Sequence, residues 1–180
     1  MDTAHQADAN AIVIRSAEPS DAAAISNLLG QVGTFEGLLQ TPDFPEAGRM
    51  EFLQKIEPHA CRLVAVAGDK VVGNAGLHLA QMSLRRFHVR YLGIGVHPQW
   101  QGRGVGRQLI ARLVDWADNW ANVLRIELHV HADNDRARAL YESFGFFEEG
   151  RHKAYALKNG RFVDCFSMAR LHPNAPRITD

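Results

Sequence analysis

The residues most suggestive of chemistry form a short segment in which three glycines alternate with larger residues: Gly102, Gly104 and Gly106. Because glycine has no side chain, such a loop lets successive backbone N–H groups converge on one anion. Arg103 and Arg107 add positive charge, and a helix that begins here would add the positive end of its dipole. The spacing therefore indicates a cradle for a phosphate group.

Two better-known phosphate-binding loops do not match this segment. A P-loop would need Lys followed by Ser or Thr after the last glycine, and a dinucleotide-binding loop would need a glycine where Arg107 stands. A tight strand-to-helix turn that binds nothing is the alternative to a phosphate cradle at this point.

The nine histidines and two cysteines raise the question of a metal or a nucleophilic thiol. No metal-binding motif is present, and His129 and His131 are separated by only one residue. Cys61 and Cys165 lie far apart with no histidine at motif spacing, so we interpret them as small core residues. We therefore expect no metal, no covalent cysteine intermediate and a reducing, cytoplasmic location.

The glycine-rich loop must be held by a strand before it and a helix after it. Residues 88–96 favour a strand, and apolar residues at spacings of three and four from Val105 to Trp120 predict an amphipathic helix. Residues 124–130 alternate, with Glu127 and His129 on the face opposite the apolar side chains. This predicts a second strand with two distinct sides.

The other expected elements complete a mixed sheet. A helix capped by Asp133 or Asn134 should end at Gly145, with Tyr141 on its apolar face. We also predict strands at 11–15, 62–67, 71–79, 146–156 and 162–170, helices at 21–29 (capped by Asp21) and 49–56, and a hairpin turn at Asn159-Gly160. Strands that are partly consecutive and partly separated by helices imply a mixed sheet and an α/β (α+β) fold.

Composition narrows the class of protein. The 180 residues, 46% of them hydrophobic, suit one domain, which we place at 11–171 between flexible terminal segments 1–10 and 172–180. Twenty basic and twenty acidic residues give zero net charge, which offers no general attraction to nucleic acid or an anionic membrane. No stretch reaches the roughly 18 apolar residues of a membrane span. We therefore expect no nucleic-acid partner and no membrane partner. Any bound anion must be held by a local group of residues.

The order and spacing of the motifs resemble the GNAT superfamily of N-acetyltransferases. The resemblance covers residues 62–170 and rests on Gln101-x-x-Gly104-x-Gly106 and Asn134-x-x-Ala137-x-x-Leu140-Tyr141-x-x-x-Gly145-Phe146. It implies an enzyme that uses acetyl-CoA. It also implies a mostly antiparallel sheet of six or seven strands, splayed between the fourth and fifth, with about four helices.

A finer similarity points to bacterial acetyltransferases of L-amino acids. It rests on Arg125-Ile126-Glu127-Leu128, Asp133-Asn134 and Gly150-x-x-x-Ala154-Tyr155-Ala156-Leu157-Lys158-Asn159-Gly160-x-Phe162-Val163-Asp164. It implies acetyl transfer to the α-amine of an L-amino acid or a similar small molecule. Acetylation of a protein N-terminus or side chain, and an inactive acyl-CoA-binding sensor, are the alternatives. A homodimer is a further expectation from the resemblance.

The resemblance also implies roles for individual residues. Tyr141 would stabilise or protonate the leaving thiolate, and the amide of Val96 would hold the thioester oxygen. The coenzyme would contact Ile94, Gly95 and Val96 along its pantetheine arm, and Gly102, Arg103, Gly104, Val105, Gly106, Arg107 and Asn134 elsewhere.

The general base is the remaining role. His129 is the first candidate, since an imidazole with a pKa of about 6.5 can accept a proton from an ammonium group. Glu127, His88 and His78 are rivals, and bulk water is another acceptor. An α-amine, with a pKa of about 7.7–8.0, needs a dedicated base less than a lysine amine does.

Overall fold

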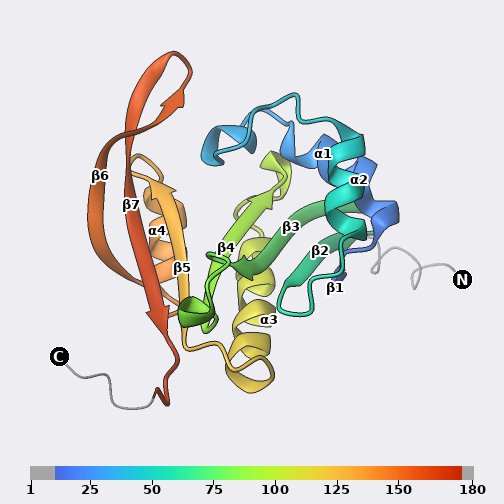
Figure 1. Ribbon diagram of the computed structural model, residues 1–180. Helices are drawn as coiled ribbons and strands as arrows, with labels where there is room; N and C mark the ends of the chain where they lie inside the picture. The colour runs from blue at the N-terminus through green and yellow to red at the C-terminus, as the bar shows by residue number, and fades with distance from the viewer. Residues whose placement is uncertain (1–10, 176–180) are drawn as a thin grey trace, which may run out of the picture. The chain divides into compact units, whose positions relative to one another are not determined.

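The computed structural model describes residues 11–175 (Figure 1). Residues 1–10 and 176–180, which include the predicted N-terminal segment and part of the C-terminal one, lie outside the described residues. The strands are β1 (Ile12–Ser16), β2 (Cys61–Ala67), β3 (Lys70–Leu79), β4 (Val89–Val96), β5 (Arg125–His131), β6 (Phe147–Lys158) and β7 (Arg161–Leu171). The α-helices are α1 (Ala22–Leu29), α2 (Glu46–Gln54), α3 (Val105–Asn119) and α4 (Asp135–Glu142).

The seven strands form a mixed sheet in the order β1-β2-β3-β4-β5-β7-β6. Antiparallel pairs join β1 to β2, β5 to β7 and β6 to β7, whereas β4 and β5 are parallel. The pairing of β4 with β5 runs only from Val89 opposite Arg125 to Tyr91 opposite Glu127, although both strands continue beyond it. The predicted mixed sheet, with its splay between the fourth and fifth strands, is confirmed.

The described chain forms two compact units that alternate along the sequence. The first unit contains residues up to 58, 62–76 and 94–109, and the second contains 59–61, 77–93 and the residues from 110 onward. Strands β3 and β4 and helix α3 each contribute residues to both units.

In the first unit, α1 supplies the apolar core. Ile25, Leu28 and Leu29 are buried and pack with Val64 of β2. Full burial of one such side chain contributes about 1.5–3 kcal/mol, so this cluster is a main source of the unit's stability. The spacing of three and four that places these residues on one face is the pattern of an amphipathic helix.

The start of α1 corrects one prediction. Asp21 occupies the predicted N-cap position of α1, after a 3-10 turn (Pro19–Asp21), but its side chain makes no capping hydrogen bond to the helix. Its carboxylate instead accepts hydrogen bonds from the backbone N–H of Glu18 at 2.8 Å and from Arg15 at 2.7 and 2.8 Å. The hydrogen bonds of Arg15 lower the pKa of Asp21, although burial opposes the shift. The aspartate thus closes the turn before the helix.

In the second unit, β5 shows the predicted two-sided pattern. Ile126, Leu128 and Val130 are buried, whereas Glu127 and His129 on the opposite face are half-buried. The long hairpin of β6 and β7 runs beside β5 (Figure 1), and the predicted Asn159-Gly160 turn joins its two strands. Arg170 of β7 forms a bidentate pair with Asp118 at 2.7 and 2.8 Å.

Some boundaries differ from the prediction. Trp120 is not part of the buried stripe of α3: the helix ends at Asn119 and the indole is 79% exposed. Helix α2 begins three residues earlier than expected, at Glu46, directly after the extended Pro45. At the C-terminal end, the backbone N–H of His172 donates to Leu124 O at 2.9 Å. Among the described residues, no helix is long and apolar enough to cross a membrane.

Candidate functional site

The predicted site residues fall into two groups, and each compact unit carries one. The first unit contains Ile94, Gly95, Val96 and the run Gly102, Arg103, Gly104, Val105, Gly106 and Arg107. The second unit contains His129, Asn134 and Tyr141.

The glycine-rich loop has the backbone shape that an anion cradle requires. Gly102 and Gly104 have φ angles of +78° and +82°, a left-handed region that favours glycine. A Cβ atom added to Gly104 would meet no atom within 4 Å, and Gly102, Arg103 and Gly104 are all exposed. The first turn of α3 begins at Val105, so its backbone N–H groups stand at the end of this open loop.

Charge near this loop comes from two arginines. Arg103 is exposed and its guanidinium lies 5.2 Å from the centre of the Trp100 ring, a distance typical of a cation–π contact. Arg107 is also exposed, on the first turn of α3. Open glycines, the start of a helix and two exposed arginines make this loop chemically suited to a phosphate group.

A set of hydrogen bonds fixes the end of β4 beside the loop. The side-chain amide of Gln101 donates to Val96 O and to Gly33 O, both at 3.1 Å, and the Thr34 hydroxyl donates to Val96 O at 3.3 Å. Thr34 is only 5% exposed, and no pattern in the sequence indicated its part in this network. The Val96 carbonyl therefore has two partners within its own unit, and an added ligand strand would have to use other backbone groups.

Gly95 has a packing role that the sequence did not reveal. A Cβ atom there would lie 2.5 Å from Cδ2 of Leu29 and 3.3 Å from Cγ2 of Thr34. The absence of a side chain at Gly95 therefore lets α1 and the loop that follows it pack close to β4. Its predicted contact with a coenzyme stays a prediction.

In the second unit, His129 is surrounded by three aromatic or imidazole side chains. Its Nδ1 atom lies 3.2 Å from the hydroxyl of Tyr91, and its ring stacks on Tyr155 with centres 4.8 Å apart. His152 meets the same ring edge-on at 5.3 Å. We call Tyr91, His129, His152 and Tyr155 the histidine cluster. Of these four residues, only His129 was assigned a chemical role in the sequence analysis.

A β-bulge brings His152 and Tyr155 to the same ring. The register of β6 against β7 shifts after His152, and Ala154 takes a positive φ of 49°. Asp164 of β7 accepts a hydrogen bond from the Ala154 N–H at 2.9 Å, and this bond, with the ammonium of Lys153, lowers the pKa of Asp164 to about 2. Because a bulge re-aims the side chains that follow it, the two rings can share one neighbour.

His129 is suited to accept a proton at neutral pH. Burial lowers its pKa, and the nearby His152 adds to that effect, while the charge of Glu127 opposes it. The imidazole is therefore neutral at pH 7 and has one nitrogen lone pair to offer.

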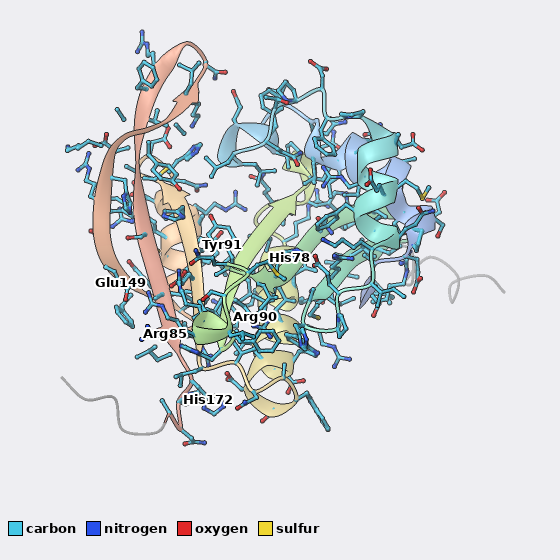
Figure 2. The ribbon with its side chains drawn as sticks, viewed as in Figure 1. His78, Arg85, Arg90, Tyr91, Glu149 and His172 are labelled. Atoms are coloured by element: carbon cyan, nitrogen blue, oxygen red, sulfur yellow. The ribbon has the colours of Figure 1, made fainter. Side chains whose placement is uncertain are left out.

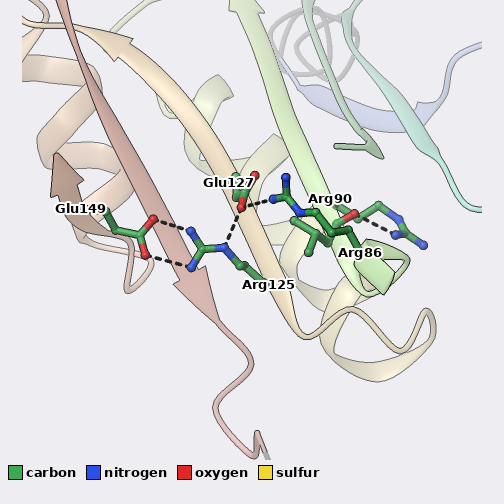
Figure 3. Close-up of polar contacts among 6 residues, drawn as sticks. Arg86, Arg90, Arg125, Glu127 and Glu149 are labelled. Carbon is green, nitrogen blue, oxygen red and sulfur yellow. Dashed lines mark hydrogen bonds and ion pairs between the residues drawn. The ribbon is translucent and has the colours of Figure 1, made fainter. Parts of the chain in front are cut away.

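Glu127, the rival on the same face of β5, is held in an ion-pair chain (Figure 3). Its Oε1 accepts from Arg86 at 2.6 Å and from Arg125 at 2.8 Å, and Arg125 also forms a bidentate pair with Glu149. Burial raises the pKa of Glu127, but Arg125 and Arg86 outweigh it and the pKa is lowered. A carboxylate stabilised in its charged form is a weak base, so the geometry favours His129.

The remaining rivals lie elsewhere on the second unit. His88 is exposed immediately before β4, and His78 is half-buried on β3. His129 has both a hydroxyl beside one ring nitrogen and a stacked aromatic ring.

Tyr141 lies on α4, whose start matches the prediction. The side-chain oxygen of Asn134 accepts from the Ala137 N–H at 3.1 Å and caps the helix. Tyr141 is 7% exposed and its ring lies 5.9 Å from that of Phe146. Burial, with a smaller effect of Tyr91, raises the pKa of Tyr141 well above its usual value. The phenol therefore keeps its proton at neutral pH and can donate it in a hydrogen bond.

The chain resembles known proteins in sequence. Residues 32–146 match the model of the acetyltransferase (GNAT) family. The chain is 39% identical over 160 residues to the L-amino acid N-acetyltransferase AaaT of Escherichia coli (strain K12), covering 89% of this chain and 98% of that protein. It is 37% identical over 114 residues to the N-alpha-acetyltransferase RimI of Mycobacterium tuberculosis, covering 63% and 67%.

A solved structure shows the same fold. The yncA protein of Salmonella typhimurium, solved with its cofactor acetyl-CoA, superposes with a TM-score of 0.83. The match covers 94% of this chain and 99% of that one, with 20% sequence identity.

Proposed function

Since the chain belongs to the GNAT family of acetyltransferases, we propose that it transfers the acetyl group of acetyl-CoA to the α-amine of an L-amino acid or similar small primary amine. One observation carries the choice of acceptor: the identity with the Escherichia coli L-amino acid N-acetyltransferase, which extends over 98% of that relative. The match therefore includes the irregular N-terminal segments in which acceptor specificity often resides.

The first unit supplies the groups that would hold acetyl-CoA. The backbone N–H groups from Gly102 to Arg107 would receive the pyrophosphate at the start of α3, supported by the open geometry of the loop. The arm of the coenzyme would run along Ile94, Gly95 and Val96, and we keep Asn134, a residue of the second unit, among the predicted contacts. The acetyl thioester provides the activated acyl group when it is bound.

The second unit supplies the groups that would move protons. The amine nitrogen attacks the thioester carbon, so that a C–N bond forms and the C–S bond breaks. His129 accepts the proton that the amine must lose, and the Tyr141 phenol donates to the departing thiolate. The Val96 amide, which belongs to the first unit, would stabilise negative charge on the carbonyl oxygen.

Direct transfer fits this chain better than a covalent enzyme intermediate. Burial raises the pKa of the Cys61 thiol to about 11 and also raises the pKa of Cys165, which is fully buried. Both thiols are therefore protonated at neutral pH and poor nucleophiles. Both are also free of disulfide bonds, which accords with a cytoplasmic enzyme. We keep a homodimer as an expectation from the family.

A second candidate function is acetylation of a protein N-terminus. It is favoured by the similarity to the Mycobacterium tuberculosis N-alpha-acetyltransferase, which covers less of this chain than the match to the amino acid enzyme does. Both reactions acetylate an α-amine. They differ in the rest of the acceptor, which is a small molecule in the first case and a protein chain in the second.

The test is thiol release from acetyl-CoA with a panel of L-amino acids, D-amino acids, short peptides and polyamines. We expect release with one or more L-amino acids and acetylation at the α-nitrogen in the product. Faster release with peptides would favour the second candidate. Tight coenzyme binding without release for any amine would favour an inactive acyl-CoA sensor.

A further inference from the structure

Tyr91 was not singled out by the sequence, yet it contacts the proposed base directly. Its hydroxyl lies 3.2 Å from Nδ1 of His129, and Figure 2 marks its place on β4. The sheet register accounts for the contact: Tyr91 pairs with Glu127 of β5, and Glu127 and His129 share one face of that strand. The pair is therefore set by backbone pairing.

The other contacts of His129 hold the ring itself. Tyr155 is stacked on it with an angle of 20° between the ring planes, and His152 approaches it edge-on at 65°. Aromatic contacts of this kind orient a ring without choosing which nitrogen carries the proton. Within the histidine cluster, that choice falls to the hydroxyl of Tyr91.

A neutral imidazole has one N–H and one lone pair, and only the nitrogen with the lone pair can accept a proton. If Tyr91 donated to Nδ1, Nε2 of His129 would carry hydrogen and could accept nothing. If Nδ1 donates to Tyr91, the lone pair is on Nε2. The pair thus determines whether His129 can act as a base through Nε2.

We propose that Tyr91 is a positioning residue whose phenol oxygen accepts the hydrogen bond from Nδ1 of His129, leaving Nε2 to take the proton of the substrate amine. This inference rests on the proposed function, because it gives the tautomer that the base requires. When His129 becomes charged, the same Nδ1–H donates more strongly to the phenol oxygen. Burial raises the pKa of Tyr91, so its oxygen stays a neutral acceptor at pH 7.

The groups that face His129 define the pH behaviour. They are Tyr91 from β4, Glu127 from β5, and His152 and Tyr155 from β6. Glu127 is paired with two arginines, which weakens its pull on the imidazole. A charge on His152 would oppose protonation of His129. We expect activity to fall on the acid side as His129 takes up its proton.

The chain offers a matched pair of variants, Tyr91→Phe and Tyr155→Phe. Each removes one hydroxyl from the histidine cluster and keeps the ring, so each retains most of the packing. Only the Tyr91 change removes a hydroxyl that lies within hydrogen-bond distance of His129. A general destabilisation of the cluster would appear in both variants.

The experiment combines ¹⁵N NMR of histidine-labelled protein with pH–rate profiles. Wild type and Tyr155→Phe should show neutral His129 with its proton on Nδ1, and Tyr91→Phe should lose that preference. In Tyr91→Phe we expect kcat to fall about fivefold or more and the acid limb to move, with KM for acetyl-CoA within about twofold of wild type.

Two results would overturn the inference. A wild-type protein with the proton on Nε2 of His129 would contradict it whether or not His129 is the base. Equal effects of Tyr91→Phe and Tyr155→Phe on the profile would reduce Tyr91 to a packing role. The role of His129 as the base is tested separately from the role of Tyr91. That role would be refuted if His129→Ala kept the kcat and pH profile of wild type.

Discussion

Replacing Gly104 with valine tests the phosphate cradle in the glycine-rich loop. Gly104 has a φ of +82° and open space around the position of a Cβ atom. Steric overlap is therefore not the problem for the new side chain. The cost is the left-handed backbone, which a β-branched residue strongly disfavours.

The expected magnitude has two parts. Holding a non-glycine residue at this φ costs about 1–3 kcal/mol of folding stability. The loop can relieve that strain by rotating its backbone, which turns N–H groups away from the bound anion. One hydrogen bond to a charged group is worth about 1.5–3 kcal/mol, so losing one weakens acetyl-CoA binding about ten- to a hundredfold.

Gly160→Val provides the matched control. Gly160 has a φ of +76° and equally open surroundings, but it lies in the turn between β6 and β7. We expect both variants to lose similar stability in urea unfolding, and only Gly104→Val to lose affinity for acetyl-CoA in calorimetric titration. Wild-type affinity in Gly104→Val, or equal losses of affinity in the two variants, would refute the cradle.

Three further predictions concern other parts of the chain. Tyr141→Phe should cut the acetylation rate about tenfold or more with almost unchanged coenzyme affinity, and near-normal turnover would rule out its proposed role. Gly95→Ala should lower the unfolding free energy by about 1–3 kcal/mol, because its methyl group would overlap Leu29; unchanged urea unfolding would contradict this packing. Asp21 has a pKa lowered from 3.8, mainly by the hydrogen bonds of Arg15, so its ionised form stabilises the fold above that pH and the benefit is lost as pH falls through the lowered pKa. The difference in unfolding free energy between wild type and Asp21→Asn should therefore become smaller in acid. An equal difference at pH 7 and pH 2 would show that the charge of the Asp21 carboxylate does not stabilise the fold.

Local patterns in the sequence predicted much of the fold. Alternation in β5 gave its buried and open faces, Asn134 gave the start of α4, and the Asn159-Gly160 pair gave the turn of the last hairpin. Each of these features depends on residues close together in the chain. Their physical causes are side-chain periodicity, helix capping and turn geometry.

Features that depend on distant residues were missed. Tyr91 and His129 are 38 positions apart, and their contact follows from strand register. The bulge that brings His152 and Tyr155 to one ring depends on Asp164 in the neighbouring strand. Glu127 remained a rival candidate for the base because one of its two arginine partners, Arg86, is 41 positions away in the sequence.

Errors also arose where a pattern continued beyond its element. Trp120 keeps the apolar spacing of α3, but the helix ends one residue before it and the side chain faces solvent. Asp21 has the residue type of a helix cap, yet its carboxylate is engaged by Arg15 and Glu18.

The central proposal is that acetyl-CoA and the α-amine of an L-amino acid are the two substrates. A competition assay tests it most directly: acetyl-CoA is supplied with equal concentrations of L-amino acids and of peptides with free N-termini, and products are identified by mass spectrometry. We predict that the purified protein forms N-acetyl-L-amino acids as the main product, and that Tyr141→Phe forms about tenfold less. Acetylated peptides as the main product, or no acetylated amine at all, would contradict the proposal.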